Sequence, residues 1–307
     1  MANLNFKKLT EVLFIVIFSK LILTFNAAAQ EIEPRFYANL PKGFNALALA
    51  YSYSSGDIVS DASSPIKDLN ISSNTPIIGY VRTFSLFNCL SRIQVNVPYT
   101  FLSGTAKLRG VDTAATRSGF SDSRIRFGIN FYGSPALAPA EFVKYKQGRI
   151  IGSSLVISVP TGQYYPEKLI NLGSNRWGFK PEIGISNDFN RLFLEGYAGV
   201  WLYTDNNDFL VNNTLSQDPL LSFQFHISYL FTNFMWVAIN ANYSNGGETS
   251  TNGIENDDYQ NNVRLGVTYS TPLTKNLSAK LQYHAAAETR SGGNYKIFVA
   301  TFQYTWF

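Results

Sequence analysis

The feature that most constrains this 307-residue chain is a period-two alternation of apolar and polar side chains in runs of about ten residues. In one run, Ile93, Val95 and Val97 alternate with polar residues. Such runs are two-faced β-strands, because successive side chains of a strand point to opposite faces. This alternation recurs in about twelve runs, near residues 47–53, 77–84, 92–101, 124–131, 151–159, 179–186, 192–203, 221–229, 235–243, 263–271, 277–287 and 298–306. An even strand count favours a closed antiparallel barrel.

The connections between these runs alternate between long and short. The long ones, rich in Asn, Asp, Ser, Gly and Thr, lie near 54–76, 102–121, 161–176, 204–217 and 245–259. The short ones lie near 85–89, 187–191, 232–233 and 272–276, and 134–147 is the one longer exception. Transmembrane barrels have long extracellular loops and short periplasmic turns. The rhythm therefore predicts an all-β, up-and-down transmembrane barrel with both termini in the periplasm.

The polar face of the runs is too charged for the dry core of a soluble sandwich. It carries Arg124, Arg126, Lys180, Glu182, Glu195, Arg264 and Lys280. Charges buried at that density would need nearly complete pairing. We therefore expect the polar face to line a lumen and the aliphatic and aromatic face to meet lipid.

Composition supports the same class. The mean hydropathy is −0.05, so the 45% of hydrophobic residues are dispersed rather than gathered in membrane-spanning helices. A single cysteine, Cys89, excludes an internal disulfide framework, and two histidines with one cysteine leave little for a transition metal. The net charge of +4 does not indicate nucleic-acid binding.

The N-terminus has the pattern of a secretory signal peptide. Lys7 and Lys8 precede a mostly apolar run from 12 to 25, and Ala27–Ala29 offers a small-residue cleavage site. The alternative is an N-terminal membrane anchor. We expect residues 1–29 to be removed, 30–42 to form a short periplasmic segment that could at most enter the lumen as a tail, and 43–307 to form the barrel in a bacterial outer membrane.

Motifs along most of the remaining chain resemble the family described as the putative meta-pathway of phenol degradation. They are Leu40–Gly43, Tyr51–Asp57, Gly79–Phe84, Val97–Tyr99, Val159–Gly162, Asn171–Trp177, Lys180–Glu182, Tyr197–Trp201, Thr204–Asn207, Gln217–Pro219, Gly246–Gly247 and Gln260–Gly266. The resemblance implies an outer-membrane β-barrel, transporter-like, that helps aromatic compounds cross the membrane. The C-terminal strand, which ends in Trp306 and Phe307, resembles the signal read by the barrel-assembly machinery, except that Phe307 lies off the apolar parity.

Twelve strands about 4.8 Å apart and tilted by about 40° predict a backbone radius of roughly 12 Å. Inward side chains then narrow the lumen. The predicted substrate track comprises Arg92, Arg124, Arg126, Lys180, Glu182, Glu195, Tyr197, Trp201, Arg264 and Lys280. Cations facing carboxylates would define a polar path, with aromatic faces for flat ligands. The alternative is a salt-bridged network that stiffens the barrel.

A second candidate group lies after a long loop, where Arg176 and Trp177 combine a cation and a ring at a predicted ligand entrance. The alternative is a Trp at the membrane interface. Two acidic loops, 205–208 and 255–258, offer oxygen ligands but lack a calcium-loop pattern, so solvated turns are expected. His226 and His284 fall on the inward parity, and no G-x-S-x-G motif is present, so no enzymatic activity, cofactor or metal is expected.

The sequence thus predicts a channel for diffusion of small hydrophobic or aromatic compounds, in contact with outer-membrane lipid. The alternative function is a structural or adhesive barrel whose outer loops do the work.

Overall fold

The computed structural model describes residues 32–307, except 58–65, 109–110, 169, 232–233 and 292–293. The expected signal peptide and its cleavage site near Ala29 lie outside the described residues. Twelve described strands form the barrel: β1 (Asn45–Asp57), β2 (Ile66–Leu86), β3 (Cys89–Leu108), β5 (Ser123–Pro135), β6 (Ile150–Val159), β7 (Gly178–Phe189), β8 (Leu192–Tyr203), β11 (Leu220–Leu230), β12 (Trp236–Gly246), β15 (Gln260–Pro272), β16 (Leu277–Glu288) and β17 (Asn294–Trp306).

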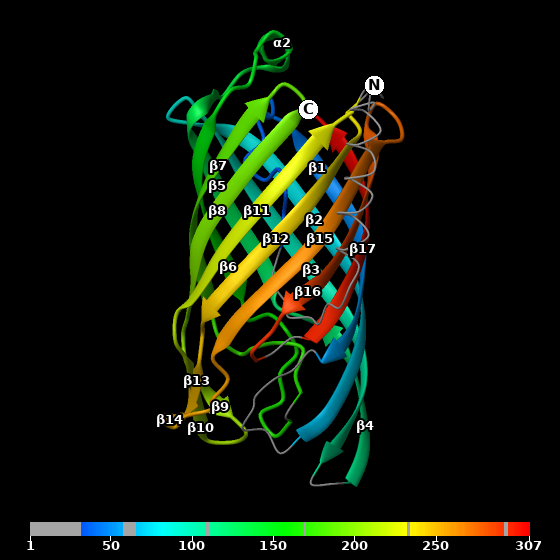
Figure 1. Ribbon diagram of the computed structural model, residues 1–307, viewed down its shortest axis with the longest axis vertical. Coiled ribbons are helices and arrows are strands. Elements are labelled where there is room, and N and C mark those ends of the chain that lie inside the picture. The colour runs from blue at the N-terminus through cyan, green and yellow to red at the C-terminus, as the bar shows by residue number, and fades with distance from the viewer. Residues whose placement is uncertain (1–31, 58–65, 109–110, 169, 232–233, 292–293) are drawn as a thin grey trace, which may run out of the picture.

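Each barrel strand pairs antiparallel with the next, and the ring closes where the first strand meets the last. Ala50 of β1 lies opposite Thr301 of β17, and Leu49 lies opposite Phe302. The long β3 pairs with β5 along its first half and with β4 (Val111–Phe120) along its second half, so β4 extends the wall beyond one rim. The predicted twelve-stranded antiparallel barrel is confirmed (Figure 1).

The two faces of the wall differ as the alternation predicts. On the outward face, Leu49, Phe225 and Phe302 are 55–60% exposed. On the inward face, Lys180 and Arg264 are each 1% exposed. The large apolar side chains therefore surround the barrel, and the charged ones fill it.

The two ends of the barrel are built differently. One end carries the short turns and the four-residue helix α2 (Pro139–Phe142). The start of β1 and the end of β17 also lie at this end (Figure 1). There the β2–β3 turn is tight, with Phe87 and Asn88 at φ 51° and 60°. At the other end, two long loops form a separate four-stranded sheet of β9 (Asn206–Phe209), β10 (Asn213–Gln217), β13 (Thr249–Thr251) and β14 (Ile254–Glu255) (Figure 1).

No helix in the described residues has the length and apolar character needed to cross a membrane.

Candidate functional site

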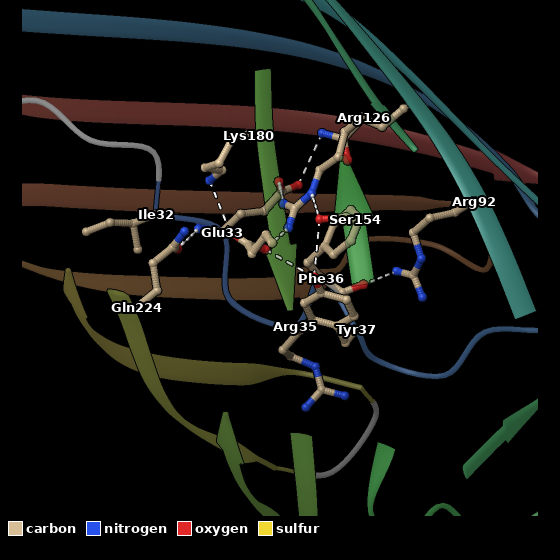
Figure 2. Close-up of polar contacts among 12 residues, drawn as sticks. Ile32, Glu33, Arg35, Phe36, Tyr37, Arg92, Arg126, Ser154, Lys180 and Gln224 are labelled. Atoms are coloured by element: carbon tan, nitrogen blue, oxygen red, sulfur yellow. Dashed lines mark hydrogen bonds and ion pairs between the residues drawn. The ribbon is translucent and has the colours of Figure 1, made fainter. Parts of the chain in front are cut away.

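Residues 32–39, which we call the lumen segment, run inside the barrel. The sequence predicts that residues 30–42 form a short periplasmic segment that could at most enter the lumen as a tail, and the structure places residues 32–39 of this stretch in the lumen (Figure 2). Phe36 is 4% exposed and Tyr37 is 0% exposed. The segment is therefore part of the barrel's interior rather than a tail outside it.

A buried charge cluster holds the segment to the wall formed by β5, β6 and β7. Arg126 pairs with Glu182 and, at 2.9 Å, with Glu33 of the lumen segment. The second oxygen of Glu182 lies 3.1 Å from the Lys180 ammonium. The Tyr37 hydroxyl donates to Glu182 and to Ser154, each at 3.2 Å (Figure 2). All carboxylates in this cluster have cationic partners, as buried charges require.

Three glycines on the same wall make room for the aromatic rings of the segment. A Cβ at Gly152 would lie 2.6 Å from Tyr37 Cδ1, and one at Gly184 would clash with the opposite edge of that ring. A Cβ at Gly128 would lie 2.9 Å from Phe36 Cζ. Gly152 and Gly184 are register partners on neighbouring strands, so together they form a slot for Tyr37.

Backbone groups of the segment are also bound by the wall. Arg92 donates to the carbonyl oxygen of Phe36 and, at 2.7 Å, to that of Ala38. The Arg35 amide donates to Glu195 at 2.8 Å, and its guanidinium lies 4.0 Å from the centroid of the Phe193 ring. These bonds replace the water that the backbone groups of the segment would otherwise bind.

The remaining predicted track residues lie around this assembly. Tyr197 is buried and packs edge-on against Tyr37, with 4.9 Å between ring centroids. Trp201 lies 5.5 Å from the Lys180 ammonium and 5.8 Å from the Arg124 guanidinium. Arg264 lies apart from them, over the Tyr295 ring at 4.8 Å. The inward residues thus form one cluster around the lumen segment and a separate contact at Arg264.

Between the lumen segment and the opposite wall lies a cavity of about 740 Å³. Its wall on β17, β1 and β2 carries no charged residue: Val299, Thr301, Gln303, Ala48, Ala50, Ile77, Gly79 and Val81. Of the predicted track, Arg124 and Lys280 line this cavity, whereas Arg92 and Arg126 bind the segment and Lys180 pairs with Glu182 behind it. The structure therefore divides the predicted track into two groups.

The loop after β6 covers the cavity at the long-loop end. Asp122 binds it by accepting hydrogen bonds from the amides of Gly162 and Ser174 at 2.9 and 2.8 Å. Arg176 lines the cavity, donates to Gln217 and lies 4.6 Å from the centroid of the Tyr203 ring. Burial lowers the pKa of Arg176, yet arginine starts high enough to remain charged.

The two predicted entrance residues lie on different faces. Trp177 is 43% exposed and stacks on Phe179 at 6.3 Å, on the outward parity of β7. Its neighbour Arg176 faces the cavity. Because side chains alternate along an extended chain, adjacent residues there cannot share one site.

Neither acidic loop nor either histidine forms a metal centre in the described part of the chain. Asp258 accepts from the Thr249 amide at 2.6 Å and from its hydroxyl at 2.7 Å, which fixes a loop. His226 Nδ1 lies 2.9 Å from Asn240 Oδ1 in the lumen wall. His284 is also buried there.

The sequence reasoning missed Glu33, Tyr37 and the three glycines as site residues. Residues 32–39 have no clear period-two pattern, so nothing in them predicts a place in the lumen. One signal was available: Gly128, Gly152 and Gly184 all fall on the inward parity of neighbouring strands, where a close approach is expected.

Comparisons with known proteins agree with this architecture. A family model described as Putative MetA-pathway of phenol degradation matches residues 54–297. The crystal structure of the COG4313 outer membrane channel from Pseudomonas putida F1 is similar, with a TM-score of 0.76 and 19% identity over 90% of this chain and 100% of that one. The β domain of the Bordetella autotransporter BrkA gives a TM-score of 0.48 and 14% identity over 86% and 100% of the two chains. No curated protein matches the sequence.

Proposed function

Because the chain belongs to the family described as Putative MetA-pathway of phenol degradation, we propose that it is an outer-membrane channel for small hydrophobic or aromatic compounds. The similar fold of the Pseudomonas putida protein, which is described as an outer membrane channel, supports the location and the channel role. The proposal includes export with removal of residues 1–29 and insertion by the barrel-assembly machinery through the C-terminal strand.

The observation that carries the proposal is the cavity beside the uncharged wall of β17, β1 and β2. A volume of about 740 Å³ lies within the range of about 300–1,000 Å³ that is typical of small-molecule sites. A water-filled porin would need a wide polar passage, whereas here the lumen segment occupies the polar half. Beside the uncharged wall the cavity can take the apolar part of a solute, and its other sides carry Glu33, Asp122, Arg124, Arg176 and Lys280.

A planar-bilayer recording of the refolded mature protein tests this function. We expect small discrete conductance steps that phenol reduces and that glucose at the same concentration leaves unchanged. Phenol must be present at concentrations that leave a protein-free bilayer silent. A correctly folded barrel that conducts no ions and takes up no phenol would remove the proposal.

The four-stranded sheet of β9, β10, β13 and β14 favours a second function, a structural or adhesive role of the outer loops. Ile254 on this sheet is 74% exposed. The test replaces residues 249–255 by a Gly-Ser linker and measures the binding of intact cells to a surface. If the variant loses surface binding but its current is still blocked by phenol, the sheet is responsible for adhesion and the barrel for transport.

A further inference from the structure

Three cations among the described residues line the cavity, and two of them, Lys280 and Arg124, lie on either side of the uncharged wall, while the third, Arg176, belongs to the covering loop. The register places Lys280 of β16 opposite Thr301, Thr301 opposite Ala50, and Ala50 opposite Ile77. One row away, Arg124 of β5 lies opposite Asn96, which lies opposite Gly79 of β2. The uncharged cavity-lining residues of β17, β1 and β2 are therefore flanked by Lys280 at one edge and by Arg124 at the other.

Both carboxylates of the cavity are already engaged. Asp122 accepts the two loop amides and also the Ser174 hydroxyl at 2.6 Å. Glu33 accepts from Arg126 at 2.9 Å and from Gln94 at 3.1 Å. Each carboxylate thus already accepts hydrogen bonds from at least two protein groups.

Lys280 is the cation with room for a ligand. Its ammonium makes no ion pair or hydrogen bond within the described part of the chain, although Glu33 attracts it electrostatically. A cation short of a partner in a confined space is stabilised by an anion, through a hydrogen bond that the charges strengthen.

We propose that this cavity binds small amphipathic monocarboxylates, with the carboxylate at Lys280 and the apolar part of the solute on β17, β1 and β2. This inference rests on the proposed channel function and names its solute class. Ala48, Ala50 and Gly79 are small, so a flat ring or short alkyl chain can lie against that wall. Arg124 lies at the opposite edge of the wall, where it adds to the positive potential of the cavity.

Isothermal titration calorimetry of the refolded protein with benzoate and benzamide tests the inference, because the two molecules have similar shape and differ in charge. At neutral pH we expect benzoate to bind at least about tenfold more tightly than benzamide. Lys280→Met should remove most of that difference while leaving benzamide affinity unchanged. Arg124→Gln should reduce the difference in affinity between benzoate and benzamide by a smaller factor.

Lys275→Met is the matched control, since Lys275 is exposed in the β15–β16 turn and its loss changes the net charge equally. Folding of each variant is checked by the heat-dependent shift of barrel migration on gels. Equal affinity for benzoate and benzamide, or a preference that Lys280→Met and Lys275→Met leave alike, overturns the inference.

The two proposals fail in different ways. A channel that phenol blocks but that shows no benzoate preference keeps the channel function and overturns the carboxylate site. A barrel that binds benzoate through Lys280 but passes no solute supports the site and removes the channel function.

Discussion

Two parts of the lumen wall, which we call its halves, differ in charge and in what lies in front of them. The half formed by β5–β8 carries Arg126, Lys180, Glu182 and Glu195, and the lumen segment covers it. In the half formed by β17, β1 and β2, the residues that line the cavity are all uncharged, and the cavity remains in front of them. Both walls belong to one barrel of uniform pairing, so the side chains alone create the difference.

This contrast shows why the segment lies where it does. Charges on β3, β5 and β7 need partners in a site with little water, and the segment supplies Glu33, the Tyr37 hydroxyl and backbone carbonyls. The uncharged wall offers no such bonds. The segment is therefore held on one side, and the free space collects on the other.

The largest expected effect comes from removing the central charge of the covered half. Glu182→Gln leaves Lys180 without its counter-ion and weakens the hold on Arg126, so the free energy of unfolding should fall by about 3–5 kcal/mol. Urea unfolding of the barrel in lipid vesicles measures this. The control is Glu167→Gln, because Glu167 pairs with Lys168 and both side chains are about half exposed. This change should lower the free energy of unfolding by less than about 0.5 kcal/mol. Similar losses for both variants would contradict the central role of the cluster.

A smaller effect is expected from filling the slot for Tyr37. Gly184→Ala places a methyl group against the ring, so we expect a loss of about 1–3 kcal/mol and a larger conductance as the segment is displaced. Gly196→Ala is the matched control, because its methyl group would meet Phe225 at 3.7 Å, an ordinary contact. If both variants conduct like the wild type, the slot does not hold the segment.

The smallest change in stability is expected in the open half. Ala50→Phe projects a ring into the cavity, where there is space, so the free energy of unfolding should change by less than about 1 kcal/mol. Phenol block of the current should nevertheless weaken, because the added ring occupies the wall. Leu49→Phe, on the lipid-facing side of the same strand, should leave the block unchanged. Undiminished block in Ala50→Phe would place the solute path elsewhere.

Most of the wall could be predicted, because the alternation of apolar and polar residues in each strand indicates which side chains point into the lumen. Arg126, Glu182 and Arg264 point inward as their parity requires, and Trp177 points outward for the same reason. Pairing could not be predicted, because Glu182 pairs with Lys180 two residues away but also with the distant Arg126, which in turn pairs with the distant Glu33. The lumen segment was missed because it forms no strand and its bonds are almost all to distant residues.

Period two and loop length are local properties, so the barrel, its strand count and the side of the wall on which each strand residue lies can be worked out from the sequence. The pairing of inward charges, the place of the lumen segment and the position of Lys280 and Arg124 beside an uncharged wall arise only in the folded barrel. Those outcomes depend on the order in which strands close into a ring and on competition among buried charges for few partners, and neither can be determined from one stretch of chain.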